Sequence, residues 1–286
     1  MSLIRRLFDR NPAAIFAKQP WTRLNLADYP RAANVPTMLS DEEQQFYIWA
    51  TRHWMRDKGA VLDLGAFIGG STARLAAGHK KAKLGGKIHS FDKFTVSNGI
   101  KERILYPQNV PRFEGRDMLP LAKDYLKPWR DRVIFQVGDI RETEWIPEPV
   151  EILALDAAKT DETTDFITQR FLRHMIPKAS ILIHQDFLHW NQPWLCAQMI
   201  GLENAFEPVA YCVPDTVVFF LKRELTEADI TAATVTGLSD KALLDAIETT
   251  RAKLAHWDVD RRFKMMARGV RNNPGQRVAW SMKRAH

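Results

Sequence analysis

Short, almost wholly apolar runs alternate along this chain with longer segments in which apolar residues recur at helical spacing. Runs rich in Val, Ile and Leu predict buried strands, and the segments between them predict helices, the first opened by a capping box of Ser40 and Glu43. The expected strands are 59–64, 87–91, 133–137, 151–155 and 180–184, and the expected helices are 40–56, 70–77, 119–129, 161–175 and 193–203. Apolar strands separated by helices predict a parallel sheet covered on both faces.

The pattern changes after the last of these helices. Two β-like runs flank the turn dipeptide Pro214-Asp215, which predicts an antiparallel hairpin. The expected fold is therefore α/β, a doubly wound and mostly parallel seven-stranded sheet closed by an antiparallel hairpin. We expect an N-terminal arm over 1–38, which four prolines interrupt, one α/β domain over 39–224, and a C-terminal helical extension with a basic tail over 225–286.

The charge of the chain is uneven. The net charge is +7, and residues 255–286 carry eight Lys or Arg against Asp258 and Asp260, so this tail accounts for +6. A tail of this kind predicts contact with an anionic surface such as a membrane or a polyanion, with a solvated or partner-packed tail as the alternative. Because the remainder is nearly neutral, we expect no nucleic-acid partner for the main domain.

Compartment follows from weaker signals. No run approaches the roughly 18 apolar residues of a membrane span, and no signal peptide is evident in the first residues. Cys196 and Cys212 are the only cysteines, which gives neither a disulfide framework nor a C-x-x-C metal motif. We expect a cytoplasmic protein.

A glycine-rich turn follows the first expected strand, in VLDLGAFIGGSTARLAAG from Val61 to Gly78. A strand that ends in a tight glycine turn and opens a helix brings backbone N–H groups close to a ligand. Gly65 would let the chain turn, and Gly69 and Gly70 would remove side chains where a cofactor lies. Carboxylates lie at the ends of the first three expected strands. Asp63 lies at the end of the first, Asp92 follows the second and is placed to bind a ribose diol, and Asp139 follows the third and is placed at an adenine pocket.

The run D-L-G-A-F-I-G-G-S-T, followed by F-D and G-D-I, resembles the S-adenosyl-L-methionine site of class I methyltransferases, and most of all the catechol and macrocin-type sugar O-methyltransferases. The resemblance covers residues 39–224. It implies that Asp63 and Gly65 line the methionine and ribose part of the cofactor, with Ser71 near its carboxylate. Asp92 would hold the ribose hydroxyls. The complete set of expected cofactor-binding residues is Asp63, Gly65, Ala66, Gly69, Ser71, Asp92, Asp139 and Asp156.

A second group of polar residues follows the next two strands. Asp156 and Lys159 come from EILALDAAKT, and His184, Gln185 and Asp186 come from SILIHQDFLHW. The first pair matches the D-x-x-K of catechol-type enzymes, whereas Gln185 stands where an aspartate is expected. Oxygen ligands suit Mg²⁺, so Asp156, Gln185 and Asp186 are the candidate metal ligands and Mg²⁺ an expected but optional cofactor. Lys159 or His184 would act as the catalytic base.

These features predict an S-adenosylmethionine-dependent O-methyltransferase whose partner is a small-molecule hydroxyl acceptor, such as a sugar or glycosylated metabolite. The alternatives are a catechol or phenol O-methyltransferase, and a cofactor-binding assembly or regulatory subunit without catalysis. Trp190 and Trp194 are either a flat wall for the acceptor or core residues. The long segment 93–116 is either a lid over the cofactor or a contact in a homo-oligomer.

Overall fold

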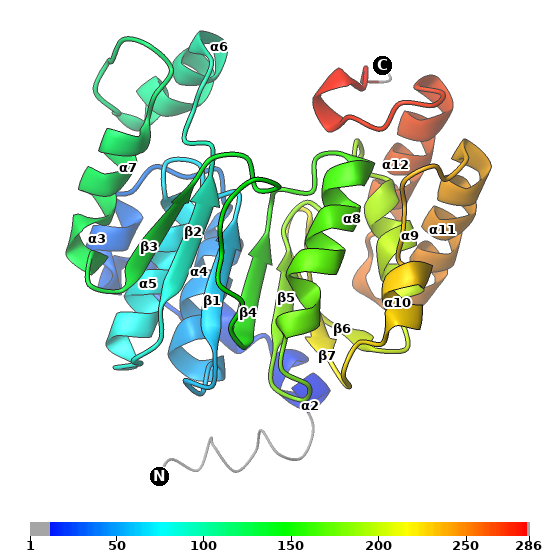
Figure 1. Ribbon diagram of the computed structural model, residues 1–286, viewed down its shortest axis with the longest axis horizontal. Coiled ribbons are helices and arrows are strands. Elements are labelled where there is room, and N and C mark those ends of the chain that lie inside the picture. The colour runs from blue at the N-terminus through cyan, green and yellow to red at the C-terminus, as the bar shows by residue number, and fades with distance from the viewer. Residues whose placement is uncertain (1–11, 285–286) are drawn as a thin grey trace. The chain divides into compact units, whose positions relative to one another are not determined.

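A seven-stranded sheet forms the centre of the fold (Figure 1), in a computed structural model that describes residues 12–284. Its hydrogen-bonded order is β3-β2-β1-β4-β5-β7-β6. The strands are β1 (Ala60–Leu64), β2 (Ile88–Asp92), β3 (Val133–Val137), β4 (Val150–Leu155), β5 (Ile181–His184), β6 (Phe206–Cys212) and β7 (Thr216–Leu221). All five strands predicted before the hairpin are confirmed, with ends that differ by one residue at most.

The sheet is mixed and mostly parallel. Parallel pairing joins β1 to β2 and β2 to β3, whereas β7 runs antiparallel to both β5 and β6. The turn between β6 and β7 contains a cis peptide bond at Val213-Pro214. The predicted fold class, with its closing antiparallel hairpin, is therefore confirmed.

The chain divides into two compact units at the end of β4. Ala14–Ala154 form what we call the N-terminal unit, and the chain from Leu155 onward belongs to the C-terminal unit. The boundaries expected at residues 38 and 224 stay a prediction.

Helices and an aromatic cluster pack within the N-terminal unit. They are α2 (Pro12–Phe16), which begins just before it, α3 (Pro30–Ala33), α4 (Asp41–Trp49), α5 (Gly70–Lys81), α6 (Asn98–Ile100) and α7 (Leu119–Leu126). The predicted capping box of α4 is present: the Ser40 hydroxyl accepts from the Glu43 amide, and the Glu43 carboxylate accepts from the Ser40 amide. Phe16 and Trp21 pack on Phe46 and are buried, so this part of the arm belongs to the core.

The segment between β2 and α7 contains short helical turns around an apolar cluster. Phe94, Val96, Leu105 and Met118 are buried there with Ala66 and Ile68 of the glycine turn. The segment is polar in composition. Its apolar residues nevertheless pack directly against the glycine turn. A lid or oligomer role for it stays a prediction.

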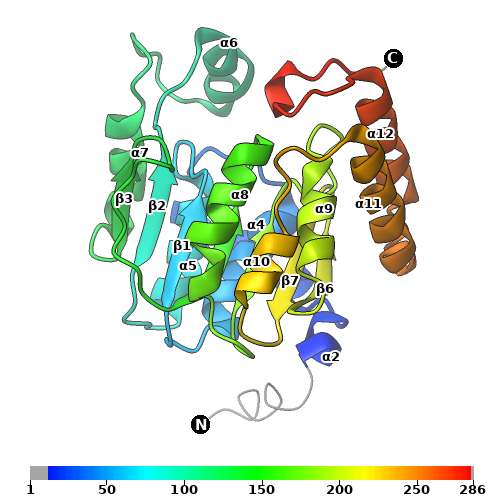
Figure 2. The same ribbon diagram turned by 45° about the vertical axis from the view of Figure 1, so that its right-hand side comes forward.

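Helices of the C-terminal unit include one that the sequence did not predict. They are α8 (Asp161–Arg170), α9 (Trp194–Gly201), α10 (Glu227–Ala232), α11 (Asp240–Lys253) and α12 (Asp260–Asn272). Figures 1 and 2 show α12 beside α11, and α11 also packs on α9. The helix that was not predicted is α12, which lies within the segment expected as a basic tail. Within the described residues, no helix is both long and apolar enough to cross a membrane.

Candidate functional site

The glycine turn has the backbone geometry that its sequence implies. Gly65 and Gly69 adopt φ values of 100° and 98°, where a side chain would be strained. The amides of Gly65 and Ala66 both donate to the carbonyl of Phe91, at 2.9 and 3.0 Å, so β2 holds the first half of the turn. Gly69 then caps the N-terminus of α5.

Protein atoms fill the space beside two of the glycines. A Cβ on Gly69 would lie 2.8 Å from the Leu126 side chain, and one on Gly70 would lie 2.5 Å from the carbonyl oxygen of Pro36. The sequence predicts that both glycines make room for a cofactor. In the structure their missing side chains make room for α7 and for the N-terminal arm. A role for these glycines beside a cofactor stays a prediction.

Asp63 lies at the end of β1 and is only 2% exposed. One of its carboxylate oxygens accepts hydrogen bonds from the hydroxyls of Ser71, at 2.8 Å, and Thr72. Burial raises the pKa of Asp63 to about 6, although these hydrogen bonds oppose the shift. The hydroxyl of Ser71, which we expected near the cofactor carboxylate, therefore orients Asp63.

Two buried hydroxyls of this network were missed by sequence reasoning. Thr72 on α5 and Ser90 on β2 are fully buried, and their oxygens lie 2.9 Å apart. The available signal was the consecutive pair Ser71-Thr72 at the start of a helix, because two neighbouring hydroxyl donors indicate a nearby hydrogen-bond acceptor. Together they join β1, β2 and α5 below the turn.

Asp92, at the end of β2, is occupied by backbone donors. Its two oxygens accept from the amides of Phe67, at 2.8 Å, and Phe94, at 2.6 Å. Phe67 and Phe94 have φ values of 53° and 49° and need such support. Burial raises the pKa of Asp92 above its usual range despite these bonds. Asp92, the residue predicted to bind the ribose, therefore stabilises the backbone of the glycine turn.

Asp139 follows β3 and is paired with two cations. Its carboxylate accepts from the Arg141 guanidinium at 3.1 Å and contacts the Lys93 ammonium at 2.9 Å. The hydrogen bond from Arg141, together with Lys93, holds the pKa of Asp139 far below its usual range. A role for Asp139 at an adenine pocket stays a prediction.

The second polar group lies in the C-terminal unit and converges on Lys159. The Lys159 ammonium donates to both Asp156 and Asp186, and Gln192 donates to Asp186 at 2.6 Å. These three charged side chains are 20–31% exposed, so the cluster faces outward from the ends of β4 and β5. The prediction that Asp156, Lys159 and Asp186 come together is confirmed, and their role as a site stays a prediction.

The charges of the cluster determine its protonation. Burial alone would lower the pKa of Lys159, but Asp156 and Asp186 raise it well above its usual range. Burial alone would likewise raise the pKa of Asp186, but Lys159 outweighs burial and holds this pKa below its usual range. Because Lys159 stays an ammonium, this environment argues against Lys159 as the proton acceptor.

The residues do not fit a divalent metal in this arrangement. The Lys159 ammonium is bonded to both carboxylates that would have to coordinate Mg²⁺. Gln185 adds only a neutral oxygen, and the described residues contain no group of three His, Cys, Asp or Glu side chains that could hold a metal. In this arrangement the positive charge between the two carboxylates is the Lys159 ammonium.

His184 is a core residue. It is 1% exposed and lies 5.5 Å, between ring centroids, from Phe187. Thr168 accepts from the Gln198 amide and donates to the Thr164 carbonyl, so the Gln198 oxygen must accept from His184 Nε2–H at 3.0 Å. Desolvation lowers the pKa of His184 to about 4, which keeps it neutral. This burial argues against His184 as the general base.

His189, in the loop after β5, was not among the bases that the sequence predicts. Asn191 donates through its amide nitrogen to the Ala279 carbonyl at 2.9 Å, so its oxygen accepts from His189 Nδ1–H. Among the described residues, Nε2 of His189 has no hydrogen-bond partner, and the ring is half-buried. The signal was its position in a loop after the strand, where side chains reach solvent, unlike His184 within β5.

The end of the chain packs on the His189 loop through Asn191, and also on the loop that contains Lys159. The Ala279 amide donates to the Lys159 carbonyl at 2.9 Å, and Val278 forms a β-bridge with Thr160. Of the two tryptophans considered for an acceptor wall, Trp194 is fully buried and donates to the Ala158 carbonyl, whereas Trp190 is half-exposed. Trp194 is therefore a core residue.

Comparison with known proteins gives structural similarities only. No family model and no curated protein matches the chain. Among solved structures, the chain is similar to cofactor-bound Rv0187 from MTB, with 17% identity over 75% of this chain and 99% of that one and a TM-score of 0.49. It is also similar to an S-adenosylhomocysteine (SAH) complex of a Bacillus cereus O-methyltransferase, with 15% identity over 69% and 90% and a TM-score of 0.45. The strand order β3-β2-β1-β4-β5-β7-β6 with β7 antiparallel is that of the class I methyltransferase fold.

Proposed function

We propose that the chain is an S-adenosylmethionine-dependent methyltransferase that methylates a hydroxyl group of a small molecule. The observation that carries this proposal is the glycine turn at the carboxyl end of β1, in a sheet with the class I strand order. In open α/β sheets this edge binds the ligand. Asp63 and Asp92, which end β1 and β2, are the polar groups for the cofactor there.

S-adenosylmethionine supplies an electrophilic methyl group on a sulfonium when it is bound. The chain's own task is to place an acceptor oxygen in line with that methyl and to remove its proton. The Lys159 ammonium, fixed by Asp156 and Asp186, is a donor that stabilises an oxygen as it loses its proton. We therefore propose a reaction in which Lys159 has the role that a metal has in catechol-type enzymes.

His189 is the proposed general base. Its free Nε2 lies in the loop that begins with Asp186, and its amide donates to the Asp186 carbonyl at 3.0 Å. Imidazole is the side chain most often used for proton transfer. Trp190 follows directly and offers an aromatic face, which suits a sugar or an aromatic ring.

The first test is binding of SAH by titration calorimetry. One site per chain is expected, and Gly65→Val should abolish binding because Gly65 has a φ of 100°. Unchanged binding in this variant would contradict the proposed cofactor site.

The second test is a screen of methyl transfer from labelled cofactor to sugars, glycosides and catechols. His189→Asn should lower kcat about 10²–10⁴-fold while SAH affinity stays the same. A chain that binds SAH but methylates none of these acceptors would favour the cofactor-binding subunit over the enzyme.

A further inference from the structure

Helix α12 presents a row of cations on one face. Arg261, Lys264, Arg268 and Arg271 are exposed, and their spacing of three or four residues places them on one side of the helix. The opposite side is buried through Phe263, Met266, Gly269 and Val270. The helix is thus anchored by an apolar face, and its basic face is directed away from the core.

Most basic residues elsewhere in the extension have acidic partners. Arg262 contacts Asp215 at 3.3 Å, Arg277 contacts Asp240 at 2.7 Å, and Lys253 contacts Glu203 at 2.6 Å. Within residues 12–284, by contrast, the side chains of Arg261, Arg268 and Arg284 make no hydrogen bond or ion pair with the protein. Uncompensated guanidinium groups close together repel one another, and an anion removes that cost.

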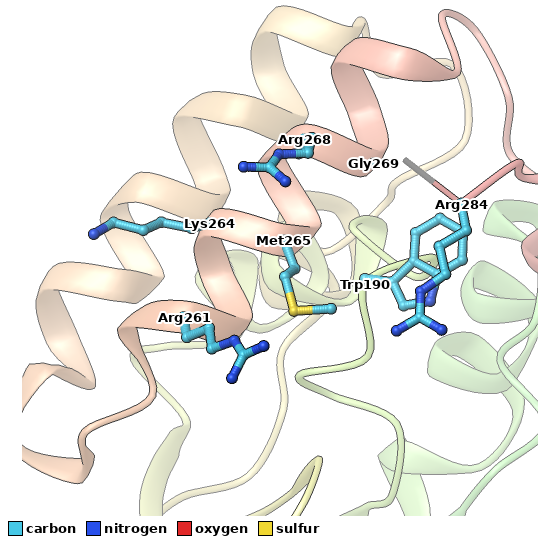
Figure 3. A pocket seen from close by; sticks show the side chains of 7 residues that line it. All are labelled: Trp190, Arg261, Lys264, Met265, Arg268, Gly269 and Arg284. Carbon is cyan, nitrogen blue, oxygen red and sulfur yellow. The ribbon is translucent and has the colours of Figure 1, made fainter. Parts of the chain in front are cut away.

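Three of these cations border one pocket. Figure 3 shows it between α12, the Trp190 loop and the end of the chain, with a volume of about 310 Å³. The Met265 side chain extends from α12 toward Trp190, and the guanidinium groups of Arg261 and Arg284 lie on either side of its tip. The pocket therefore has a cationic rim and an apolar wall.

The wall is held in place. A Cβ on Gly269 would lie 2.8 Å from the Trp190 carbonyl oxygen and 3.1 Å from the indole, so this glycine lets Trp190 pack on the α12 backbone. Met282 also approaches this position. On the other side, Asn191 bonds to the Ala279 carbonyl and holds the loop to the end of the chain. A fixed indole beside guanidinium groups is a preorganised surface for a ring that carries an anion.

We propose that this pocket binds the phosphate ester of a small molecule, with its ring against Trp190 and Met265 and its phosphate between Arg261 and Arg284. A guanidinium group can donate two parallel hydrogen bonds to the oxygens of a phosphate, and aromatic rings stack on indole. The pocket is in the size range of small-molecule sites. A flat lipid surface would instead use the whole basic face of α12, including Arg271, and would have no need of the recess at Trp190.

The test uses the full chain and measures binding by calorimetry, without cofactor, so it does not depend on the proposed methyl transfer. The probes are phenyl phosphate and inorganic phosphate. Phenyl phosphate should bind more tightly than inorganic phosphate. Arg261→Ala and Arg284→Ala should each weaken phenyl phosphate binding about tenfold or more, since hydrogen bonds between charged groups are lost. Trp190→Ala should remove the advantage of phenyl phosphate over inorganic phosphate.

Arg271→Ala is the matched control because it removes the same charge from the same helix face, outside this pocket. It should leave the affinity within about twofold of the wild type, because the pocket's own contacts remain. An equal loss in Arg271→Ala and Arg261→Ala would overturn the proposal, because the binding would then be diffuse attraction to the helix. So would absence of phenyl phosphate binding at low salt. A third overturning result is binding only to phosphatidylcholine vesicles that contain phosphatidic acid, with no binding of the soluble ester.

Discussion

Asp63 shows how one buried residue couples stability to pH. Its pKa is raised to about 6 in the folded chain from 3.8, so the fold favours the protonated form. The stability that Asp63 contributes to the fold is fully present below about pH 4 and is lost as the pH rises through about 6. At pH 7.5, Asp63→Asn should therefore raise the free energy of unfolding, measured in urea, by up to about 3 kcal/mol. At pH 4 the gain in this free energy should be near zero.

Asp139→Asn is the control with the opposite sign. The pKa of Asp139 is held far below its usual range, mainly by Arg141, so its ionised form stabilises the fold above the unfolded pKa. This variant should lose stability at pH 7.5. If Asp63→Asn loses stability as well, the charge on Asp63 is compensated in the fold, and the inferred pKa is wrong.

Lys159 gives a second prediction at this scale. The wild-type chain should not bind Mg²⁺ or Mn²⁺ in calorimetry, because an ammonium is bonded to both carboxylates. Lys159→Met should lose turnover and gain weak binding of these ions, because two carboxylates can hold Mg²⁺. Asp156→Asn added to Lys159→Met should remove the gained binding. Wild-type binding that needs Asp156 and Asp186 would contradict Lys159 as the resident cation.

Element identity was predictable where the pattern was local. The strands are short apolar runs bounded by turns, and the Ser40–Glu43 capping box is a contact over three residues. Helix α12 was missed because its many arginines predicted a solvated tail, although Phe263, Met266 and Val270 recur at helical spacing. The side-chain partners of Asp92 and His189 were not predictable, because Phe67 and Asn191 reach them through loop geometry that has no sequence period.

The contact between α5 and the N-terminal arm gives a prediction at the scale of elements. Gly70→Ala places a Cβ 2.5 Å from the Pro36 carbonyl oxygen, and backbone there cannot move without moving the arm. Arg74 of α5 also donates to the Val35 carbonyl at 2.7 Å, so the arm is held from both points. The variant should lose about 1–3 kcal/mol of stability in urea unfolding.

Gly99→Ala is the matched control, because no atom beyond its chain neighbours and its own helix backbone lies within 4 Å of its Cβ position. It should be nearly neutral. A Gly70→Ala chain with wild-type stability and lowered SAH affinity would show instead that Gly70 makes room for the cofactor, as the sequence alone suggested.

At the scale of the whole molecule, the two candidate sites belong to different units. Asp63 and Asp92 lie in the N-terminal unit, whereas Asp156, Lys159 and Asp186 lie in the C-terminal unit. In the proposed function, the first group binds the cofactor and the second group faces the acceptor. Substitutions in one unit should therefore change one binding step and leave the other.

Removal of residues 274–286 tests this division, because this segment pairs with the acceptor-side loop. The deletion removes the amide of Ala279 that donates to Lys159, the bridge of Val278 to Thr160, and the acceptor for Asn191. Turnover should fall about 10²-fold, since small displacements of positioning groups have effects of that size. SAH affinity measured by calorimetry should stay within about twofold, because no residue of the glycine turn is touched. Trp280→Ala, a change at a 74% exposed side chain in the same segment, should leave both quantities unchanged. A deletion that abolishes SAH binding together with turnover would show that the two sites are not separable in this way.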